Sequence, residues 1–160
     1  MIDNGNVVYS NNSAIDSDIK AKLVFFSPRS QKRLKKAFLD AKKAVEKYQN
    51  ENTDANARHI YREFILAYEL NKHGFSFEYE KNLQAKKPDW LDLTAKIMIE
   101  SYTYERGGSA LFIDRVSAAI NKKCNKYEMI IESNSIRFLV AVYIDFLTFM
   151  SIEEIREDPK

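Results

Sequence analysis

The stretch of sequence that decides the fold is residues 88–103, PDWLDLTAKIMIESYT. It contains two apolar segments, one around Trp90 and Leu91 and one over residues 97–99, with a short polar stretch between them. Segments of this kind, rich in Ile, Trp and Tyr, are typical of β-strands. Residues 88–103 therefore predict a β-hairpin that turns near Thr94 and Ala95, although this turn lacks the Gly or Asn that tight turns favour.

The pairing of the two strands brings acidic residues together. A turn centred between Thr94 and Ala95 places Asp89 opposite Glu100, and opposite residues have Cβ atoms about 5 Å apart on one face of a sheet. Two carboxylates at that distance repel each other, and burial strengthens the repulsion. A divalent cation such as Mg²⁺ would relieve it, because Mg²⁺ takes oxygen ligands and commonly binds one or two carboxylates plus a substrate phosphate. Tyr102, two residues after Glu100, points to the same side.

The segments around the hairpin predict an α/β core. A helix is predicted over residues 57–73, with Ile60, Phe64 and Leu70 on its buried side, and a half-buried strand over residues 75–80. After the hairpin, a helix over residues 109–127 precedes residues 138–147, an apolar run typical of a strand buried on both faces. The order helix, strand, strand, strand, helix, strand predicts a mixed central sheet flanked by helices.

An extra basic helix and an arm precede this core. Pro28 and Ser30 open a predicted helix that extends to Tyr48, and residues 29–47 contain eight basic and two acidic residues. Residues 1–28 are predicted to be a partly ordered arm, in which residues 22–27 form a short strand or a docking segment. A polar loop is predicted over residues 50–56 and a short helix over residues 151–160. The predicted division is thus an arm, residues 1–28, and one domain, residues 29–160, with its core at about 57–145.

The composition excludes several classes of protein. The 160 residues, 45% hydrophobic and 30% charged, have the balance of one globular domain. The single cysteine, Cys124, excludes an intramolecular disulfide and a cysteine-based zinc cluster. The most apolar stretch, residues 138–150, contains Asp145 and is too short to cross a bilayer, and residues 1–13 lack the pattern of a secretory signal. We therefore expect a cytoplasmic protein with no membrane partner.

The hairpin carries a resemblance to a known family. Pro88 and Asp89, a short strand, and then Ile99-Glu100-Ser101-Tyr102 resemble the motif of the PD-(D/E)xK nuclease superfamily, which has the restriction-endonuclease-like fold. The predicted element order is similar to the αβββαβ core of that superfamily over about residues 57–145. The resemblance implies a metal-dependent endonuclease that hydrolyses phosphodiester bonds in DNA, with RNA as the less favoured alternative.

The resemblance also implies roles for particular residues. Asp89 and Glu100 would be metal ligands, with the backbone carbonyl of Ser101 as a further ligand. Many members carry a glutamate on the helix before the first core strand, and Glu63 fits this position best, with Glu69 as the second choice. The implied cofactor is Mg²⁺ or Mn²⁺, which would activate water and stabilise the charge that builds on the scissile phosphate.

One position departs from the motif. Tyr102 stands where the superfamily has a lysine, and a phenol with a pKa near 10 is a poor base at pH 7 and carries no positive charge. Some members recruit a basic residue from elsewhere, and Lys122, Lys126 and Arg106 are the candidates here. The choice between them stays open at this point. The candidate catalytic residues are Asp89, Glu100, Tyr102 and Glu63.

The basic helix predicts contacts with phosphates. Its alternative interpretation is a solvated helix face, because lysine is a good helix former. The candidate nucleic-acid-binding residues are Lys32, Lys35, Lys36, Lys43, Arg106 and Lys122.

Other functions stay open as well. Without the motif lysine, the chain could be a catalytically silent nuclease-fold module that binds nucleic acid or assembles with a partner protein in a larger complex. A third interpretation is a regulatory protein whose basic helix binds an acidic protein surface. A homodimer, which restriction-type enzymes often form, is also open. Individual residues have structural alternatives: Asp89 as a turn residue after Pro88, Glu100 as a strand charge facing water, and Glu63 as a solvated helix residue.

Overall fold

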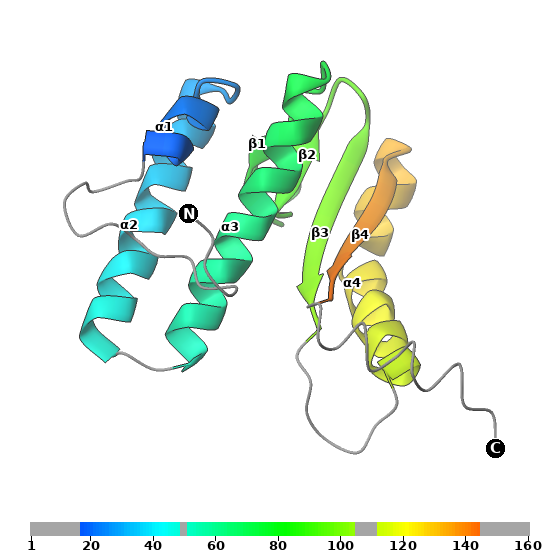
Figure 1. The fold of residues 1–160 in the computed structure, drawn as a ribbon. Coiled ribbons are helices and arrows are strands. Elements are labelled where there is room, and N and C mark those ends of the chain that lie inside the picture. Colours follow the sequence, from blue (N-terminus) through cyan, green and yellow to red (C-terminus); the bar gives the residue numbers. More distant parts are fainter. Residues whose placement is uncertain (1–16, 49–50, 105–111, 145–160) are drawn as a thin grey trace, which may run out of the picture.

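The computed structural model describes residues 17–48, 51–104 and 112–144, and for residues 51–54 it describes the backbone alone. Helices and strands follow one another in the order shown in Figure 1. The elements are α1 (Ser17–Leu23), α2 (Pro28–Tyr48), α3 (Glu51–Lys72), β1 (Glu78–Tyr79), β2 (Trp90–Asp92), β3 (Ile97–Thr103), α4 (Phe112–Asn134) and β4 (Arg137–Tyr143).

The four described strands form one mixed sheet in the order β1-β2-β3-β4. β1 pairs with β2 and β2 with β3 in antiparallel fashion, whereas β3 and β4 are parallel. Parallel neighbours need a crossover connection, and α4 lies in that connection. The predicted mixed α/β architecture and the predicted order of its core elements are confirmed.

Helices cover both faces of the sheet, so the described chain has three layers (Figure 1). Because side chains alternate along a strand, Trp90 and Ile99 pack with Phe64 of α3 on one face. Leu91 and Met98 pack with Tyr127 of α4 on the other face. The hairpin thus supplies apolar side chains to two cores.

The hairpin has the predicted register. Trp90 pairs with Ile99 and Asp92 pairs with Ile97, which is the pairing that places Asp89 opposite Glu100. The turn compensates for its missing glycine in two ways. Lys96 adopts a positive φ of 53°, and the buried Asp92 carboxylate accepts a hydrogen bond of 2.8 Å from the Ala95 amide.

The described part of the N-terminal arm packs onto the domain. Residues 22–27 do not form a strand, because Ser17–Leu23 is the helix α1 and residues 24–27 are a turn and its exit. Ile19, Leu23 and Phe26 are buried together with Leu34 and Phe38 of α2. Amphipathic spacing of Ile19 and Leu23, four residues apart, accounts for the helix.

Two predicted elements differ at the two ends of α3. The loop predicted over residues 50–56 is wrong, because α3 begins at Glu51 and its polar first turns are compatible with a helix. Of the strand predicted over residues 75–80, only Glu78–Tyr79 is a strand in the structure. The reason is that two backbone amides are bonded to side chains. The Phe77 amide donates to Asn71 Oδ1 at 2.7 Å, and the Ser76 amide donates to the Asp92 carboxylate at 2.7 Å. These side chains satisfy backbone groups that a longer strand would have paired.

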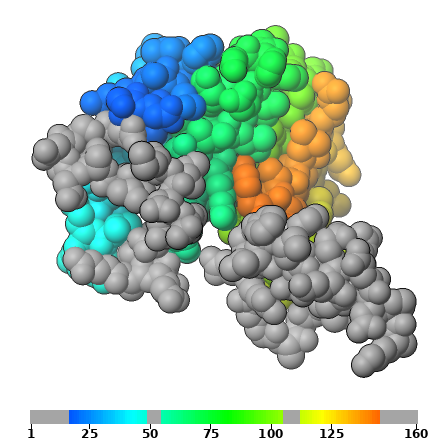
Figure 2. Space-filling view, in the orientation of Figure 1, coloured from blue at the N-terminus to red at the C-terminus, as the bar shows by residue number. Residues whose placement is uncertain are grey.

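The last helix and strand also differ from expectation. α4 continues past residue 127 to Asn134, because Tyr127 and Ile130 extend its buried stripe. β4 is an edge strand within the described sheet, and Leu139 is 51% exposed. The prediction of burial on both faces is therefore wrong for residues 138–143, and Figure 2 shows β4 at the surface beside α3. Residues 145–147 of the predicted strand, the helix predicted over 151–160 and Arg106 lie outside the described residues.

Within residues 17–48, 51–104 and 112–144, no helix is long and apolar enough to cross a membrane.

Candidate functional site

Three carboxylates, those of Glu63, Asp89 and Glu100, lie near enough to interact electrostatically, because the charges of Glu63 and Glu100 both act on Asp89. Glu63 of α3 is 4% exposed and Glu100 of β3 is 2% exposed. Asp89 immediately precedes β2 and is half-buried. The burial of Glu63 and Glu100 excludes the interpretation of either residue as a charge facing water. Buried acids need partners, because burial without one is costly.

The hydrogen-bond partners of the three carboxylates come from three elements, α3, β3 and α4. His59 Nε2 lies 2.9 Å from Glu63 Oε1, one helical turn away on α3. The Ser101 amide donates to Asp89 Oδ2 at 2.6 Å. Lys123 Nζ of α4 donates to Glu100 Oε2 at 2.7 Å.

The neighbouring negative charges affect the pKa of Asp89. Burial and then the charges of Glu63 and Glu100 together raise the pKa of Asp89 to about 7, against the opposing effects of the Ser101 hydrogen bond and of Lys123. Near neutral pH this carboxyl is therefore poised between its two protonation states. A bound cation would favour the ionised state.

This shift predicts that the protein loses stability as pH rises. An aspartate with an ordinary pKa of 3.8 is ionised in the unfolded chain, whereas Asp89 keeps its proton in the folded protein up to about pH 7. The folded state then binds more protons than the unfolded state, so the free energy of unfolding falls between those two pH values. Chemical denaturation in EDTA at a series of pH values measures the effect. The difference between wild type and Asp89→Asn isolates this group, and a difference that does not change over this pH window would contradict the prediction.

His59 ties α3 to the end of β3. Its Nδ1 lies 2.9 Å from Thr103 Oγ1, and its Nε2 faces Glu63. The hydrogen bond to Glu63 raises the pKa of His59, although burial opposes it. A protonated His59 satisfies both neighbours as a donor. The sequence interpretation did not include this residue in the site.

The structure identifies a different lysine from those considered in the sequence. Lys122 is exposed, whereas its neighbour Lys123 bonds directly to Glu100. Lys126, the other candidate of α4, lies 3.6 Å from the second oxygen of Glu100, which also accepts a hydrogen bond from the Tyr127 hydroxyl. Lys123 precedes the buried Tyr127 by one turn, and this i, i+4 relation is the signal that could have found it.

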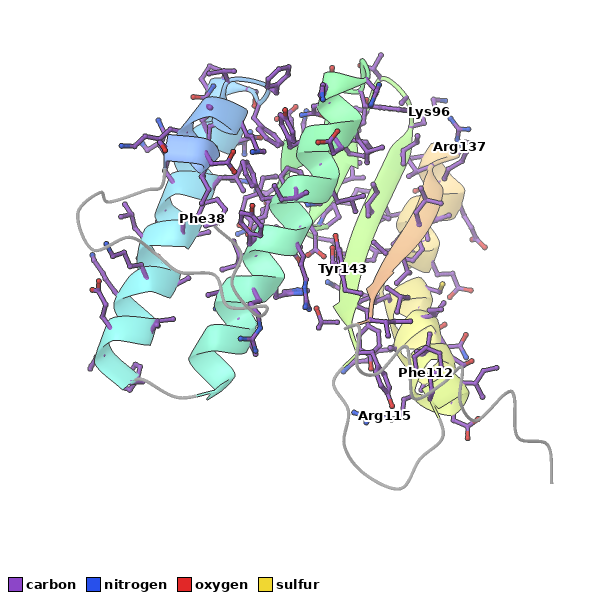
Figure 3. The ribbon with its side chains drawn as sticks, in the orientation of Figure 1. Phe38, Lys96, Phe112, Arg115, Arg137 and Tyr143 are labelled. Atoms are coloured by element: carbon purple, nitrogen blue, oxygen red, sulfur yellow. The ribbon has the colours of Figure 1, made fainter. Side chains whose placement is uncertain are left out.

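Another tyrosine, Tyr143, links the end of β4 to α3. Tyr143, labelled in Figure 3, ends β4 and donates from its hydroxyl to the Arg62 carbonyl of α3 at 3.0 Å. Burial and the nearby Glu63 raise the pKa of Tyr143 to about 12. It therefore stays neutral and acts as a hydrogen-bond donor beside the acidic residues.

A pocket of about 380 Å³ adjoins the three carboxylates. His59, Ser101 and Lys123 line it, and these are the partners of Glu63, Asp89 and Glu100 respectively. The remaining lining residues are Ala55, Asn56, Tyr102 and Thr103. The pocket therefore lies beside the acidic cluster, with the hydrogen-bond partners of the carboxylates in its wall.

The donor set fits a cation only in part. Among the described residues, no three His, Cys, Asp or Glu side chains are arranged as a ready metal-binding group. Asp89 and Glu100 offer carboxylate oxygens, and the raised pKa of Asp89 reflects an excess of negative charge. Mg²⁺ is suited to such a site because it completes its shell with water and substrate phosphate.

The basic residues of α2 form a second feature. Lys32, Lys35, Lys36 and Lys43 are exposed, and with Leu39 they line a surface pocket of about 490 Å³. We call these four lysines the α2 basic face. The opposite side of the helix is buried.

No protein-family model, curated protein or solved structure matches this chain.

Proposed function

We propose that this protein is a metal-dependent nuclease of the PD-(D/E)xK type, with a restriction-endonuclease-like fold, that hydrolyses phosphodiester bonds in DNA. One observation carries the proposal: Asp89 and Glu100, placed opposite each other by the hairpin, lie beside a pocket together with a third acid, Glu63, whose charge also acts on Asp89. Lys123 and His59 pair with Glu100 and Glu63 within the fold, so the negative charge that a bound cation would balance is the excess at Asp89, whose pKa is raised to about 7.

Each residue has a distinct role in this proposal. Asp89 and Glu100, with the Ser101 carbonyl, would hold Mg²⁺ or Mn²⁺, and the bound metal supplies Lewis-acid stabilisation of charge on the phosphate. Glu63 completes the acidic cluster and is itself held by His59. Tyr102 lines the pocket beside them.

Lys123 takes the place of the lysine missing from the motif. It approaches Glu100 from α4 and also lines the pocket, so its ammonium group lies where a phosphate would approach the carboxylates. A cation there balances developing negative charge and can orient the attacking water. Its distance of 2.7 Å from Glu100 is shorter than that of Lys126, at 3.6 Å.

The α2 basic face would bind the DNA backbone. Replacing Lys35 and Lys36 together with Ala is expected to reduce the slope of log affinity against log salt by roughly 0.7–0.9 for each phosphate that the variant no longer neutralises. Fluorescence anisotropy over a salt series measures that slope. The matched control replaces Lys20 and Lys72, exposed lysines of α1 and α3, and should leave it unchanged. An unaltered slope in the Lys35 and Lys36 variant would remove α2 from the interface.

A catalytically silent module is the second candidate function. The observation that favours it is that both oxygens of Glu100 are already engaged, by Lys123 on one side and by Tyr127 and Lys126 on the other. Such a module would bind nucleic acid or assemble with a partner protein or a second copy of this chain.

Cleavage assays separate the two candidates. Labelled DNA and RNA are incubated with the protein in Mg²⁺, Mn²⁺ or EDTA. Turnover that requires the metal supports the nuclease, whereas binding without turnover in any condition supports the silent module. Cleavage of RNA with no cleavage of DNA would correct the substrate.

A further inference from the structure

The burial of the acids and the small volume of the adjoining pocket limit the size of the substrate group that can approach them. Glu63 and Glu100 are 4% and 2% exposed, and the adjoining pocket has a volume of about 380 Å³. This volume is near the lower end of the range of about 300–1,000 Å³ for pockets that take small molecules. A single nucleotide is a ligand of that size, whereas a base-paired duplex is far wider. A strand whose nucleotides are free to turn inward meets this limit.

The lining of the pocket has the chemistry that a nucleotide requires. Tyr102 offers an aromatic ring, and the Asn56 side chain offers an amide with both a donor and an acceptor. Lys123, whose ammonium group lies beside Glu100, provides positive charge for a phosphate. His59 holds Thr103, which anchors the end of β3 to α3 and keeps these walls together. The lining thus offers groups that suit a base and a cation that suits the backbone.

We propose that the substrate is single-stranded or locally unpaired DNA, and that Tyr102 stacks on the base next to the scissile phosphate while Asn56 contacts the edge of that base. This proposal rests on the nuclease function proposed above and names its substrate. Stacking on an aromatic side chain is the usual way in which proteins hold unpaired bases, and it tolerates any sequence.

The proposal also explains the departure at position 102. Because Lys123 provides the cation from α4, a lysine is not required at position 102. The tyrosine there supplies an aromatic ring for stacking. Tyr102 is half-buried and belongs to the pocket lining.

Binding in EDTA tests the proposal without any turnover. Short fluorescein-labelled DNA is offered as a single strand, as a blunt duplex and as a duplex with an internal unpaired bubble, with single-stranded RNA as a further arm. We expect the single strand and the bubble to bind at least about tenfold more tightly than the blunt duplex. Tyr102→Ala should weaken single-strand binding about tenfold, with Tyr102→Phe recovering most of the affinity because it keeps the ring. Tyr48→Ala, at an exposed tyrosine at the end of α2, is the matched control.

The outcomes separate this proposal from the nuclease function. Equal or tighter binding of the blunt duplex, or a Tyr102→Ala variant that binds the single strand like wild type, overturns the substrate proposal. Metal-dependent cleavage of duplex DNA in the same preparation would then leave the nuclease function standing. A single-strand preference that depends on Tyr102, without cleavage in Mg²⁺ or Mn²⁺, overturns the nuclease function and keeps the pocket as a single-strand site. Tighter binding of RNA than DNA overturns the choice of DNA, and no binding of any nucleic acid overturns both proposals.

Discussion

A metal-dependent cleavage rate about 10³-fold below that of wild type is expected for Asp89→Asn and for Glu100→Gln. Each change removes one of the two carboxylates that would hold the metal, and Lewis-acid stabilisation of the transition state contributes several kcal/mol. Each 1.4 kcal/mol corresponds to about tenfold in rate. Single-turnover cleavage of labelled single-stranded and duplex DNA measures the loss.

The controls for these variants separate chemistry from folding. Asp89→Asn removes a charge that the fold carries at a cost, since burial and neighbouring acids raise the pKa of Asp89 to about 7. This variant should therefore be at least as stable as wild type at neutral pH, and its inactivity would not reflect unfolding. Glu69→Gln, at an exposed glutamate on the same helix as Glu63, should cleave at the wild-type rate. Cleavage that survives both Asp89→Asn and Glu100→Gln would locate the activity elsewhere or in a contaminant.

Lys123→Met should lower the cleavage rate by about 10²-fold, while Lys122→Met should leave it unchanged. The two residues are neighbours on α4, yet only Lys123 donates to Glu100, and Lys122 is exposed. The expected loss follows from the usual contribution of a positioned proton-transfer or charge-stabilising group, about 10²–10⁴-fold. Steady-state cleavage by both variants, with melting temperatures measured in parallel, tests the difference.

A double variant tests whether a lysine at position 102 can replace Lys123. Tyr102→Lys places an amine at the motif position, so combining it with Lys123→Met should restore part of the lost rate. The same double variant should lose the preference for single strands, because it lacks the ring of Tyr102. If Lys126→Met is the more damaging change, the nearby amine that matters is Lys126, which lies 3.6 Å from Glu100.

The central hairpin could be predicted because its signals are local. Strand segments, a short connection and side-chain alternation set the register that pairs Trp90 with Ile99, and this register brings Asp89 and Glu100 together. Glu63 was implied by the resemblance, and its place on the same helix side as Ala67 and Leu70 favoured it over Glu69. The ends of elements were harder to predict. Residues 75–77 do not extend β1, because Asn71 and Asp92, from other parts of the chain, take their hydrogen bonds.

The partners of the acids required the tertiary structure. Lys123 and Glu100 are 23 residues apart, and His59 and Thr103 are 44 apart, so no local period relates them. The same holds for α1, whose Ile19 and Leu23 find their place against α2 and α3.

By itself, then, the sequence determined the order of the core elements, the register of the hairpin and the pairing position of Asp89 and Glu100 within it. These depend on periodicity and on pairing between close neighbours, which backbone geometry dictates. Only the tertiary structure decided which cation neutralises Glu100, how His59 anchors β3 and that a pocket opens beside Tyr102. These features arise where α3, β3 and α4 meet, and the packing of the whole core sets the distances between those elements.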